Sequence, residues 1–250
     1  MRDKVTIRLF RGNADGGTET DYEVTTFPGM VVLDAIHQIQ GTQDSTVACR
    51  WNCKAAKCGS CSAEINGRPR LMCKSHVEDF ADSNGLIRVH PLKTFPLIKD
   101  LVTDVSINYR TAEKIPPLTV SEDIPRPFKM QQIDVERIQE FRKCIECFLC
   151  QDVCHVLRDH NRKDGYFGPR FMIKIAALNM HPLDSENRLR QLKEEGGIGY
   201  CNITKCCEEV CPEHIHLTDN GIIPLKERVA DYYYDPLKIL IRKIVGPKKR

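Results

Sequence analysis

Four cysteines between Cys144 and Cys154 constrain the fold of this chain more than any other feature of its sequence. Their spacing, C-x2-C-x2-C-x3-C, lets three thiolates hold corners of a 4Fe-4S cubane while the fourth points to a different cluster. The run therefore predicts two metal centres, which must be completed from elsewhere in the chain. A second group, Cys201, Cys206, Cys207 and Cys211-Pro212, repeats the outer spacing of the run and has Thr204 where its middle cysteine would fall.

Disulfides and structural zinc are the alternative explanations for the 13 cysteines. Disulfide frameworks belong mostly to small secreted domains, whereas this sequence has 250 residues and no apolar signal segment after Met1. Structural zinc usually takes one C-x2-C pair and a second pair of Cys or His ligands, a pattern that four cysteines within eleven residues do not follow. Iron-sulfur clusters are therefore the favoured interpretation.

The composition indicates an ordinary globular protein, with 41% hydrophobic and 28% charged residues. No run of about 18 apolar residues occurs, so we expect no transmembrane helix and a chain that is cytosolic or faces the cytosol. A net charge of +3 without interleaved basic and aromatic residues argues against nucleic-acid binding.

A third cysteine group lies in the first hundred residues, at Cys53, Cys58, Cys61 and Cys73. Its C-x4-C-x2-C opening is the spacing of plant-type 2Fe-2S ferredoxins. Asn66-Gly67 is a hairpin turn signal, so the chain should fold back and return Cys73 to the loop. Gly59 suits a loop whose backbone approaches a cluster closely. Cys49 is left over and is interpreted as a small buried apolar residue.

Hydrophobic periodicity predicts a β-rich first part and a helical second part. The first part should contain a hairpin of strands 4–10 and 22–27 around a turn at Gly12–Gly17, a helix at 31–39 and a strand at 84–92, after which 95–102 leads away from the domain. The proline-rich stretch 114–128 should form a semi-rigid surface connector. Helices should follow from Gln131 through Ile133, Ile138 and Phe141, over 171–178, and from an Asp184 cap through Leu192 to Gly196-Gly197.

The histidines at 155, 160, 181, 214 and 216 are not at ligand spacing with one another and are interpreted as surface or core residues.

Taken together, the cysteine groups, Cys58-Gly-Ser-Cys61, the Ile-Asn-Gly turn, Ile98–Val102 and Cys211-Pro212 resemble the iron-sulfur subunit of the succinate dehydrogenase and fumarate reductase family, here a bacterial member. The resemblance implies an α+β chain. A β-grasp 2Fe-2S ferredoxin domain over 1–106 would precede an all-α bacterial-type ferredoxin domain over 107–250.

The same resemblance implies three clusters and their ligands. Cys53, Cys58, Cys61 and Cys73 would hold a 2Fe-2S cluster, Cys144, Cys147, Cys150 and Cys211 a 4Fe-4S cluster, and Cys154, Cys201 and Cys207 a 3Fe-4S cluster. Thr204 offers only a neutral hydroxyl at the corner where a fourth iron would need a thiolate. Cys49 and Cys206 would then be packing residues.

The implied role is electron transfer between a flavoprotein catalytic subunit and a quinone at membrane-anchor subunits, on the cytoplasmic face of the inner membrane. Ubiquinone-reducing members carry Pro, a Trp pair and His where this chain has His155, Arg158, Asp159 and Asn202. Menaquinone, with most contacts made by the anchor subunits, is therefore expected. A heterodisulfide reductase-like or glycolate oxidase-like partner and a zinc scaffold are the rival hypotheses.

The C-terminal residues predict an amphipathic helix capped by Asp235, begun by Pro236 and ended by Gly246-Pro247. Its apolar stripe comprises Leu237, Leu240, Ile241 and Ile244, among basic residues that continue to Arg250. One interpretation is a surface helix packed on its own domain. The other is a helix that docks on the membrane-anchor subunits with its basic residues toward anionic headgroups.

Overall fold

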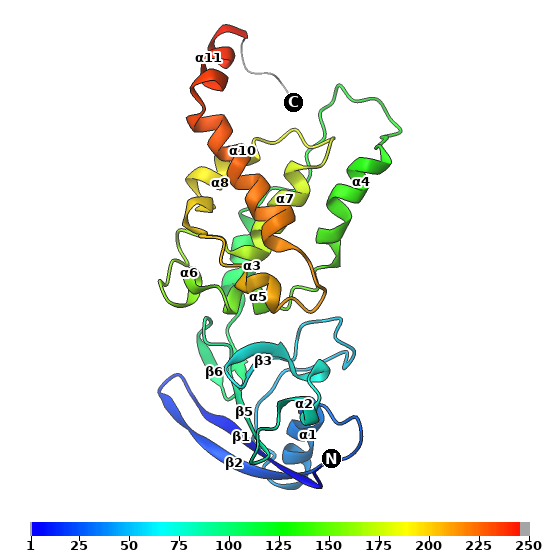
Figure 1. The fold of residues 1–250 in the computed structure, drawn as a ribbon, viewed down its shortest axis with the longest axis vertical. Helices are drawn as coiled ribbons and strands as arrows, with labels where there is room; N and C mark the ends of the chain where they lie inside the picture. The colour runs from blue at the N-terminus through cyan, green and yellow to red at the C-terminus, as the bar shows by residue number, and fades with distance from the viewer. Residues whose placement is uncertain (1, 246–250) are drawn as a thin grey trace. The chain divides into compact units, whose positions relative to one another are not determined.

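The computed structural model describes residues 2–245 and divides into two compact units (Figure 1). Unit 1 takes the chain up to Ile107, together with Ile145–Val153 and Val210–Glu213. Unit 2 takes Asn108–Cys144, Cys154–Glu209 and the chain from His214 onward. The units interleave along the sequence, whereas the predicted domains 1–106 and 107–250 are continuous; that boundary stays a prediction.

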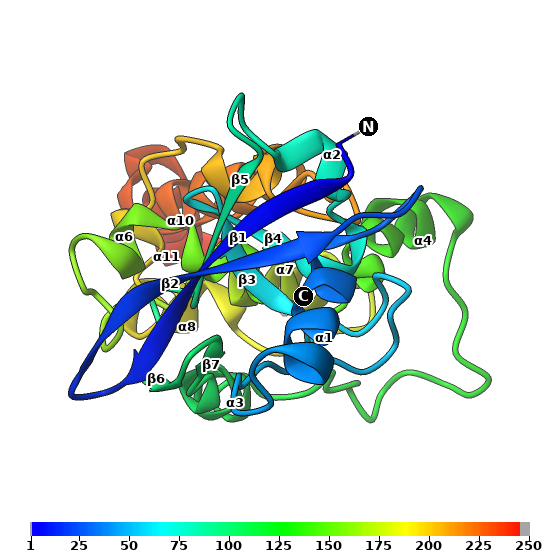
Figure 2. The ribbon, with the colours of Figure 1, turned by 90° about the horizontal axis from the view of Figure 1, so that it is seen from below.

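Unit 1 is built on a mixed β-sheet (Figure 2). Within the described residues its strands are β1 (Lys4–Asn13), β2 (Gly16–Thr25), β3 (Ser62–Ile65), β4 (Arg68–Leu71), β5 (Leu86–His90), β6 (Leu97–Lys99) and β7 (Val102–Thr103). The order is β4-β3-β5-β1-β6-β7, with β2 also paired to β1. β1 runs antiparallel to β2 and parallel to β5, so it is the strand on which the sheet is assembled.

The first hairpin is longer and tighter than the sequence predicted. β1 and β2 pair without interruption from Lys4↔Thr25 to Asn13↔Gly16, which leaves a two-residue turn at positions 14–15. Glycine is needed inside the strands because their backbones come very close: a Cβ on Gly12 would lie 2.3 Å from the carbonyl oxygen of Gly16. The predicted Gly12–Gly17 turn is therefore wrong in its extent, although the hairpin itself is confirmed.

A helix covers the apolar side of this sheet. α1 (Val32–Thr42) begins after Val31, whose backbone N–H donates to the Asp34 carboxylate at 3.2 Å. Its buried residues, spaced for one helical face, are Val32, Leu33, Ala35, Ile36 and Ile39. α1 packs against β2, whose Val24 is fully buried, as is Ile7 on the neighbouring strand β1. The short helix α2 (Val77–Phe80) follows β4.

Two further predictions for unit 1 have different outcomes. The Asn66-Gly67 turn is confirmed, because both residues have positive φ, 50° and 78°, and join the paired strands β3 and β4. The prediction that 95–102 leaves the domain is wrong, because β6 pairs with β1 at Asn13↔Lys99 and β7 pairs with β6. The alternation over so short a stretch was too weak to reveal an edge strand.

Unit 2 is helical, which with the sheet of unit 1 confirms the predicted α+β class. Its helices are α4 (Gln132–Gln139), α6 (His155–Arg158), α7 (Pro169–Asn179), α8 (Arg188–Glu194), α9 (Cys206–Glu209), α10 (Ile223–Tyr234) and α11 (Pro236–Val245), together with most of α3 (Ser106–Glu113), which begins at the end of unit 1. α5 (Leu149–Asp152) lies in the Ile145–Val153 segment of unit 1. Short 3-10 turns η1 (Met72–Lys74), η2 (Glu140–Lys143) and η3 (Ile198–Tyr200) and a π-helical segment η4 (Leu217–Ile222) complete the elements.

α7 is the core helix of unit 2. It begins at Pro169, after Gly168, and so includes the predicted helix 171–178; Met172, Ile175 and Ala176 are fully buried. Leu192 of α8 and Leu225 of α10 have no exposed surface either. On α4, Ile133 is 56% exposed, and among the described residues of this helix only Ile138 is buried.

The connector after α3 is irregular, as predicted, but its beginning is firmly held. Arg188 is only 1% exposed and donates to the carbonyl oxygens of Pro116 and Pro117 at 2.8 Å each. The same guanidinium forms an ion pair with the Asp184 carboxylate, with Arg188 Nε 2.8 Å from Asp184 Oδ2. Asp184 is therefore an ion-pair partner and not the predicted cap, which is Asn187.

Candidate iron-sulfur sites

The loop that carries Cys53, Cys58 and Cys61 has the backbone of a cluster-binding loop. Lys54, Ala56 and Gly59 have positive φ, which turns successive N–H groups inward. The Cys53 sulfur accepts hydrogen bonds from the backbone N–H of Ala55 and of Lys57, both at 3.3 Å. Such donors stabilise a thiolate, the form in which cysteine binds iron.

The structure brings together all four cysteines predicted to bind the 2Fe-2S cluster. Burial acts to raise the pKa of Cys58, but hydrogen bonds from Ser60 and from Cys53 outweigh it and lower the pKa to about 7. Burial, together with the adjoining sulfurs of Cys73 and Cys58, raises the pKa of Cys61 to about 12. Cys61 is buried and Cys53 is exposed, so the set runs from the interior of unit 1 to its surface.

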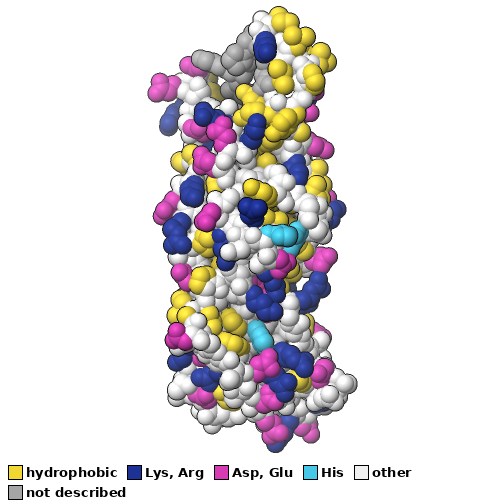
Figure 3. Space-filling model, turned by 90° about the vertical axis from the view of Figure 1, so that its left-hand side faces the viewer, with side chains coloured by type: hydrophobic (Ala, Val, Ile, Leu, Met, Phe, Trp, Pro, Cys, Tyr) yellow, Lys and Arg dark blue, Asp and Glu magenta, His cyan; other side chains and the backbone are white. Residues whose placement is uncertain are grey.

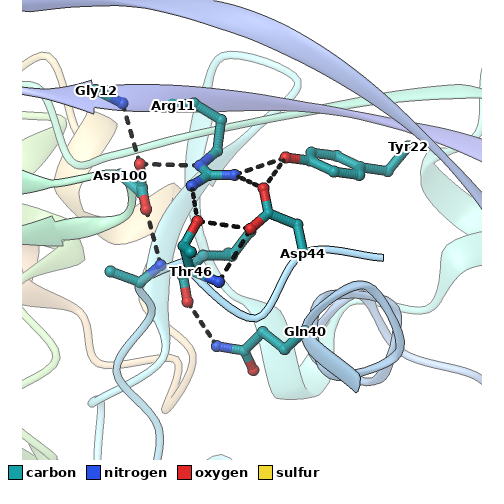
Figure 4. Close-up of polar contacts among 9 residues, drawn as sticks. Arg11, Gly12, Tyr22, Gln40, Asp44, Thr46 and Asp100 are labelled. Carbon is teal, nitrogen blue, oxygen red and sulfur yellow. Dashed lines mark hydrogen bonds and ion pairs between the residues drawn. The ribbon is translucent and has the colours of Figure 1, made fainter. Parts of the chain in front are cut away.

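A charged network fixes the segment that leads into this loop (Figure 4). Asp100, 2% exposed, accepts from Arg11 Nε and from the backbone N–H of Gly12 at 3.0 Å, and from the N–H of Ala48 at 2.8 Å. Arg11 also pairs with Asp44. The side-chain hydrogen bond from Thr46 and then that from Arg11 hold the pKa of the Asp44 carboxyl well below its usual range.

Tyr22 completes the network, with its hydroxyl 2.6 Å from Arg11 Nη1 and donating to Asp44 at 2.9 Å. β1, β2 and the chain before Cys49 are thereby tied to the β6–β7 turn. Cys49 lies outside the cysteine set, half-buried, and accepts from Gln40 at 3.7 Å.

The cysteines predicted to bind the 4Fe-4S cluster lie mostly in unit 1. Cys147, Cys150 and Cys211 belong to its segments Ile145–Val153 and Val210–Glu213, and Cys144 ends a segment of unit 2. Both unit 1 segments contact the 2Fe-2S region. Lys74 donates to the carbonyl oxygen of Pro212 at 3.0 Å, and Lys57 pairs with Glu213 at 3.0 Å.

The closest approach of these two regions is at Gly59. A Cβ placed on this residue would lie 2.5 Å from the Cα of Cys147, so only glycine fits. Next to it, the Ser62 hydroxyl lies 2.8 Å from the carbonyl oxygen of Gly59 and 2.9 Å from that of Cys147. The loops of the first two predicted sites are therefore in direct backbone contact inside unit 1.

Cys154, Cys201 and Cys207 gather in unit 2. Burial raises the pKa of Cys154 to about 11, against opposing hydrogen bonds from the backbone N–H groups of Leu157 and Val156, and raises that of Cys207 to about 12. The sulfur of Cys201 also contributes to raising the pKa of both cysteines. Buried thiols of this kind lose their protons when a metal binds them, so the donor set fits an iron cluster.

Cys206 is closer to this set than the sequence suggested. Its sulfur also contributes to raising the pKa of Cys154 and of Cys207. The same sulfur lies 3.4 Å from the hydroxyl of Thr204. Within residues 2–245 no three His, Cys, Asp or Glu side chains are arranged around a single metal ion. The ligand assignment of all the cysteines stays a prediction.

Comparison with known proteins agrees with both halves of this description. Residues 5–109 match the profile of the 2Fe-2S iron-sulfur cluster binding domain, and residues 140–215 match that of the 4Fe-4S dicluster domain. The structure superposes on a chain of the Mycobacterium smegmatis Sdh1 complex in the apo form with a TM-score of 0.91 and 56% identity, covering 95% of this chain and 100% of that chain. The chain belongs to the succinate dehydrogenase and fumarate reductase iron-sulfur subunit family.

Of two relatives in this family, one is named for succinate dehydrogenase and the other for fumarate reductase. The succinate dehydrogenase iron-sulfur subunit of Bacillus subtilis is 29% identical over 87% of this chain and 90% of its own length. The fumarate reductase iron-sulfur subunit of Haemophilus influenzae is 28% identical over 83% and 85%. Membership in the family makes this an iron-sulfur protein of 2Fe-2S, 4Fe-4S and 3Fe-4S clusters.

Family membership also places the chain in a multi-subunit oxidoreductase. In the described part of the chain, no helix has the length and apolar character needed to cross a membrane.

Proposed function

We propose that this chain relays single electrons between a flavoprotein catalytic subunit and a quinone in a succinate:quinone oxidoreductase. Bound clusters would supply one-electron carriers, which divide the two-electron chemistry of a flavin into single steps. The chain's own residues hold the carriers in order and exclude water from them. It offers no dicarboxylate site of its own in this proposal.

The contact at Gly59 carries the proposal. Electron transfer between carriers requires that their binding loops be close and fixed, and here the two loops touch through Gly59 and Cys147. Ser62 sits beside both carbonyl oxygens and holds this spacing. The exposed Cys53 lies at the outer side of the first loop, where a partner protein can approach.

A cavity of about 460 Å³ supports the acceptor side of the proposal. Its lining includes His155, His160, Arg162, Tyr200 and Asn202, of which His155 and Asn202 directly follow two predicted ligands of the third cluster. These side chains can donate hydrogen bonds to quinone carbonyl oxygens but offer little apolar surface for a quinone tail. The tail would be held by the anchor subunits, in line with the expectation of menaquinone.

α11 supports docking on the membrane-anchor subunits. Asp235 accepts from the backbone N–H of Leu237 and Lys238, which confirms the predicted cap. The stripe is uncovered by the described chain, with Leu237 65%, Leu240 54%, Ile241 49% and Ile244 75% exposed. Figure 3 shows these hydrophobic side chains gathered on α11. The alternative of a helix packed on its own unit is therefore disfavoured, while Gly246-Pro247 and the tail lie outside the described residues.

Deleting Leu237–Arg250 should leave all three clusters intact but release the subunit from membranes, more so at high salt because exposed charges act only within about 8 Å at physiological ionic strength. Equal membrane retention of the truncated and intact subunits at every ionic strength would contradict the docking role.

The type of the third cluster depends on Thr204. Its hydroxyl lies 3.5 Å from His155 Nδ1 and near Cys206, and it offers no thiolate for a fourth iron. We infer a 3Fe-4S cluster, whose EPR signal should appear in the oxidised protein and be lost in Thr204→Cys. Cys206→Ala and Cys49→Ala should retain full iron content; loss of a cluster in either would reassign that residue as a ligand.

The function itself is tested on the anaerobically purified complex. Cluster signals in visible absorbance and EPR would exclude the zinc scaffold, since zinc is silent in both. Co-purification with a flavoprotein and succinate-dependent reduction of menaquinone would support the proposal. Absence of succinate-dependent reduction from a complex with all clusters present would favour the heterodisulfide reductase-like or glycolate oxidase-like partner instead.

A further inference from the structure

Tyr166 lies next to the third predicted cluster site, although neither the sequence motifs nor the proposed ligands include it. The chain before α7 runs alongside the chain after α8, where the N–H of Phe167 donates to the carbonyl oxygen of Gly196 at 3.2 Å. Gly197 follows in the left-handed region, with φ 61°, and a Cβ on it would lie 1.9 Å from the carbonyl oxygen of Gly165. This close backbone contact sets Tyr166 beside the segment that ends at Cys201.

The hydroxyl of Tyr166 is buried with no ordinary partner. The residue is 2% exposed, and its oxygen makes no hydrogen bond of normal geometry to any atom of the described chain. A buried hydroxyl without a hydrogen-bond partner is destabilising, so this one calls for a partner that the polypeptide itself does not supply. The sulfur of Cys201 lies within range to accept from it.

All three predicted ligands of the third cluster lie near enough to this hydroxyl for their sulfurs to affect its pKa. Burial raises the pKa of Tyr166 well above its ordinary value, and the sulfurs of Cys201, Cys154 and Cys207 raise it further. A phenol has an ordinary pKa of about 10, so at neutral pH it carries its proton and can donate a hydrogen bond to sulfur. Within the described residues this hydroxyl is therefore a buried donor without a normal hydrogen bond, in the neighbourhood of the three cysteines.

We propose that the Tyr166 hydroxyl donates a hydrogen bond to a sulfur of the third cluster, either the Cys201 thiolate or an inorganic sulfide, and so raises the cluster's reduction potential. Tyr166 is thus a positioning and tuning residue with no bond made or broken. A donor to sulfur favours the reduced state because that state carries more negative charge. The proposal rests on the ligand set proposed above for that cluster.

The test is an EPR-monitored redox titration of the intact, anaerobically purified complex. Tyr166→Phe keeps the ring and removes the donor, and it should shift the oxidised-to-reduced ratio of the third cluster about three- to tenfold toward oxidised, where tenfold is 59 mV for one electron. Tyr234→Phe, at a tyrosine that is 67% exposed, is the matched control and should leave the potential unchanged.

A second substitution keeps the test decisive if Tyr166→Phe does not assemble the cluster. 3-Fluorotyrosine incorporated at position 166 is a more acidic phenol and a stronger donor, so the potential should rise, opposite in sign to the phenylalanine variant. A potential that stays unchanged in every variant whose third cluster is assembled would overturn the proposal. Absence of any third-cluster EPR signal in the unmodified complex would instead overturn the ligand assignment.

Discussion

Replacing Gly59 by alanine should force apart the two cysteine loops of unit 1. The residue has φ 69°, where a side chain costs about 1–2 kcal/mol. Its new Cβ would lie 2.5 Å from Cα and 2.8 Å from Cβ of Cys147, atoms that no side-chain rotation can move away. Overpacking of this kind costs about 1–3 kcal/mol more, so we expect about 2–5 kcal/mol in total.

Gly67→Ala is the matched control. Gly67 has φ 78° in the β3–β4 turn, and its Cβ would meet nothing within 4 Å. It therefore carries the backbone cost of about 1–2 kcal/mol without the collision. The difference between the two variants isolates the contact between the loops.

The assay is the temperature at which visible cluster absorbance is lost, measured at one heating rate in the anaerobic complex. At about 2–4 °C per kcal/mol for a chain of this size, Gly59→Ala should bleach roughly 2–12 °C below Gly67→Ala. Its 2Fe-2S and 4Fe-4S signals should also weaken relative to the control. Equal bleaching temperatures with full iron content in both variants would refute the role assigned to this contact.

Three other predictions concern residues away from the clusters. Asp100→Ala removes the acceptor shared by Arg11, Gly12 and Ala48 and should lower the free energy of unfolding by about 3–5 kcal/mol in urea, against at most about 1 kcal/mol for Asp21→Ala at the exposed pair with Arg8. Arg188→Lys loses the planar guanidinium that donates to the carbonyl oxygens of Pro116 and Pro117, so a broad-specificity protease should cleave the 114–128 connector faster. Arg190→Lys, at an exposed ion pair, should be cleaved at the same rate as the unmodified chain. Burial acts to raise the pKa of Glu140, but hydrogen bonds from the His216 N–H and the Asn220 amide outweigh it and depress the pKa, so its stabilisation is present above the ordinary value of 4.5 and lost as pH falls through the lowered one. Glu140→Gln should therefore flatten the fall of the circular-dichroism unfolding midpoint below about pH 5, and an unchanged slope would contradict the linkage.

Local chemistry made the turns and the long elements predictable from sequence. Asn66-Gly67 needs positive φ at both positions, and Asp235-Pro236 supplies a cap and a first helical residue, so each signal depends only on adjacent residues. The α7 helix was also visible, since its apolar residues extend over three turns. The Asp184 cap failed because a competing partner, Arg188, one turn ahead in the chain, takes the carboxylate.

Contacts between distant segments could not be predicted in this way. The cysteine spacing named every candidate ligand, but neither the closeness of Gly59 to Cys147 nor the burial of Tyr166 beside Cys201 leaves a mark in the sequence. Both depend on backbone approaches between segments that are tens of residues apart. The glycines that permit them look like any loop glycine until the neighbouring backbone is known.

The elements around the cysteines show why periodicity fails there for a physical reason. α5, α6 and α9 have four residues each, and helices much shorter than about 12 residues are marginal in water. Each contains or directly follows a predicted ligand: Cys150 lies in α5, Cys154 precedes α6, and Cys207 lies in α9. Metal binding contributes free energy to folding where ligands from separate segments meet. We therefore expect metal binding at the predicted sites to stabilise these single turns, which are too short to show a periodic apolar pattern. The signal that predicts them is the cysteine spacing itself.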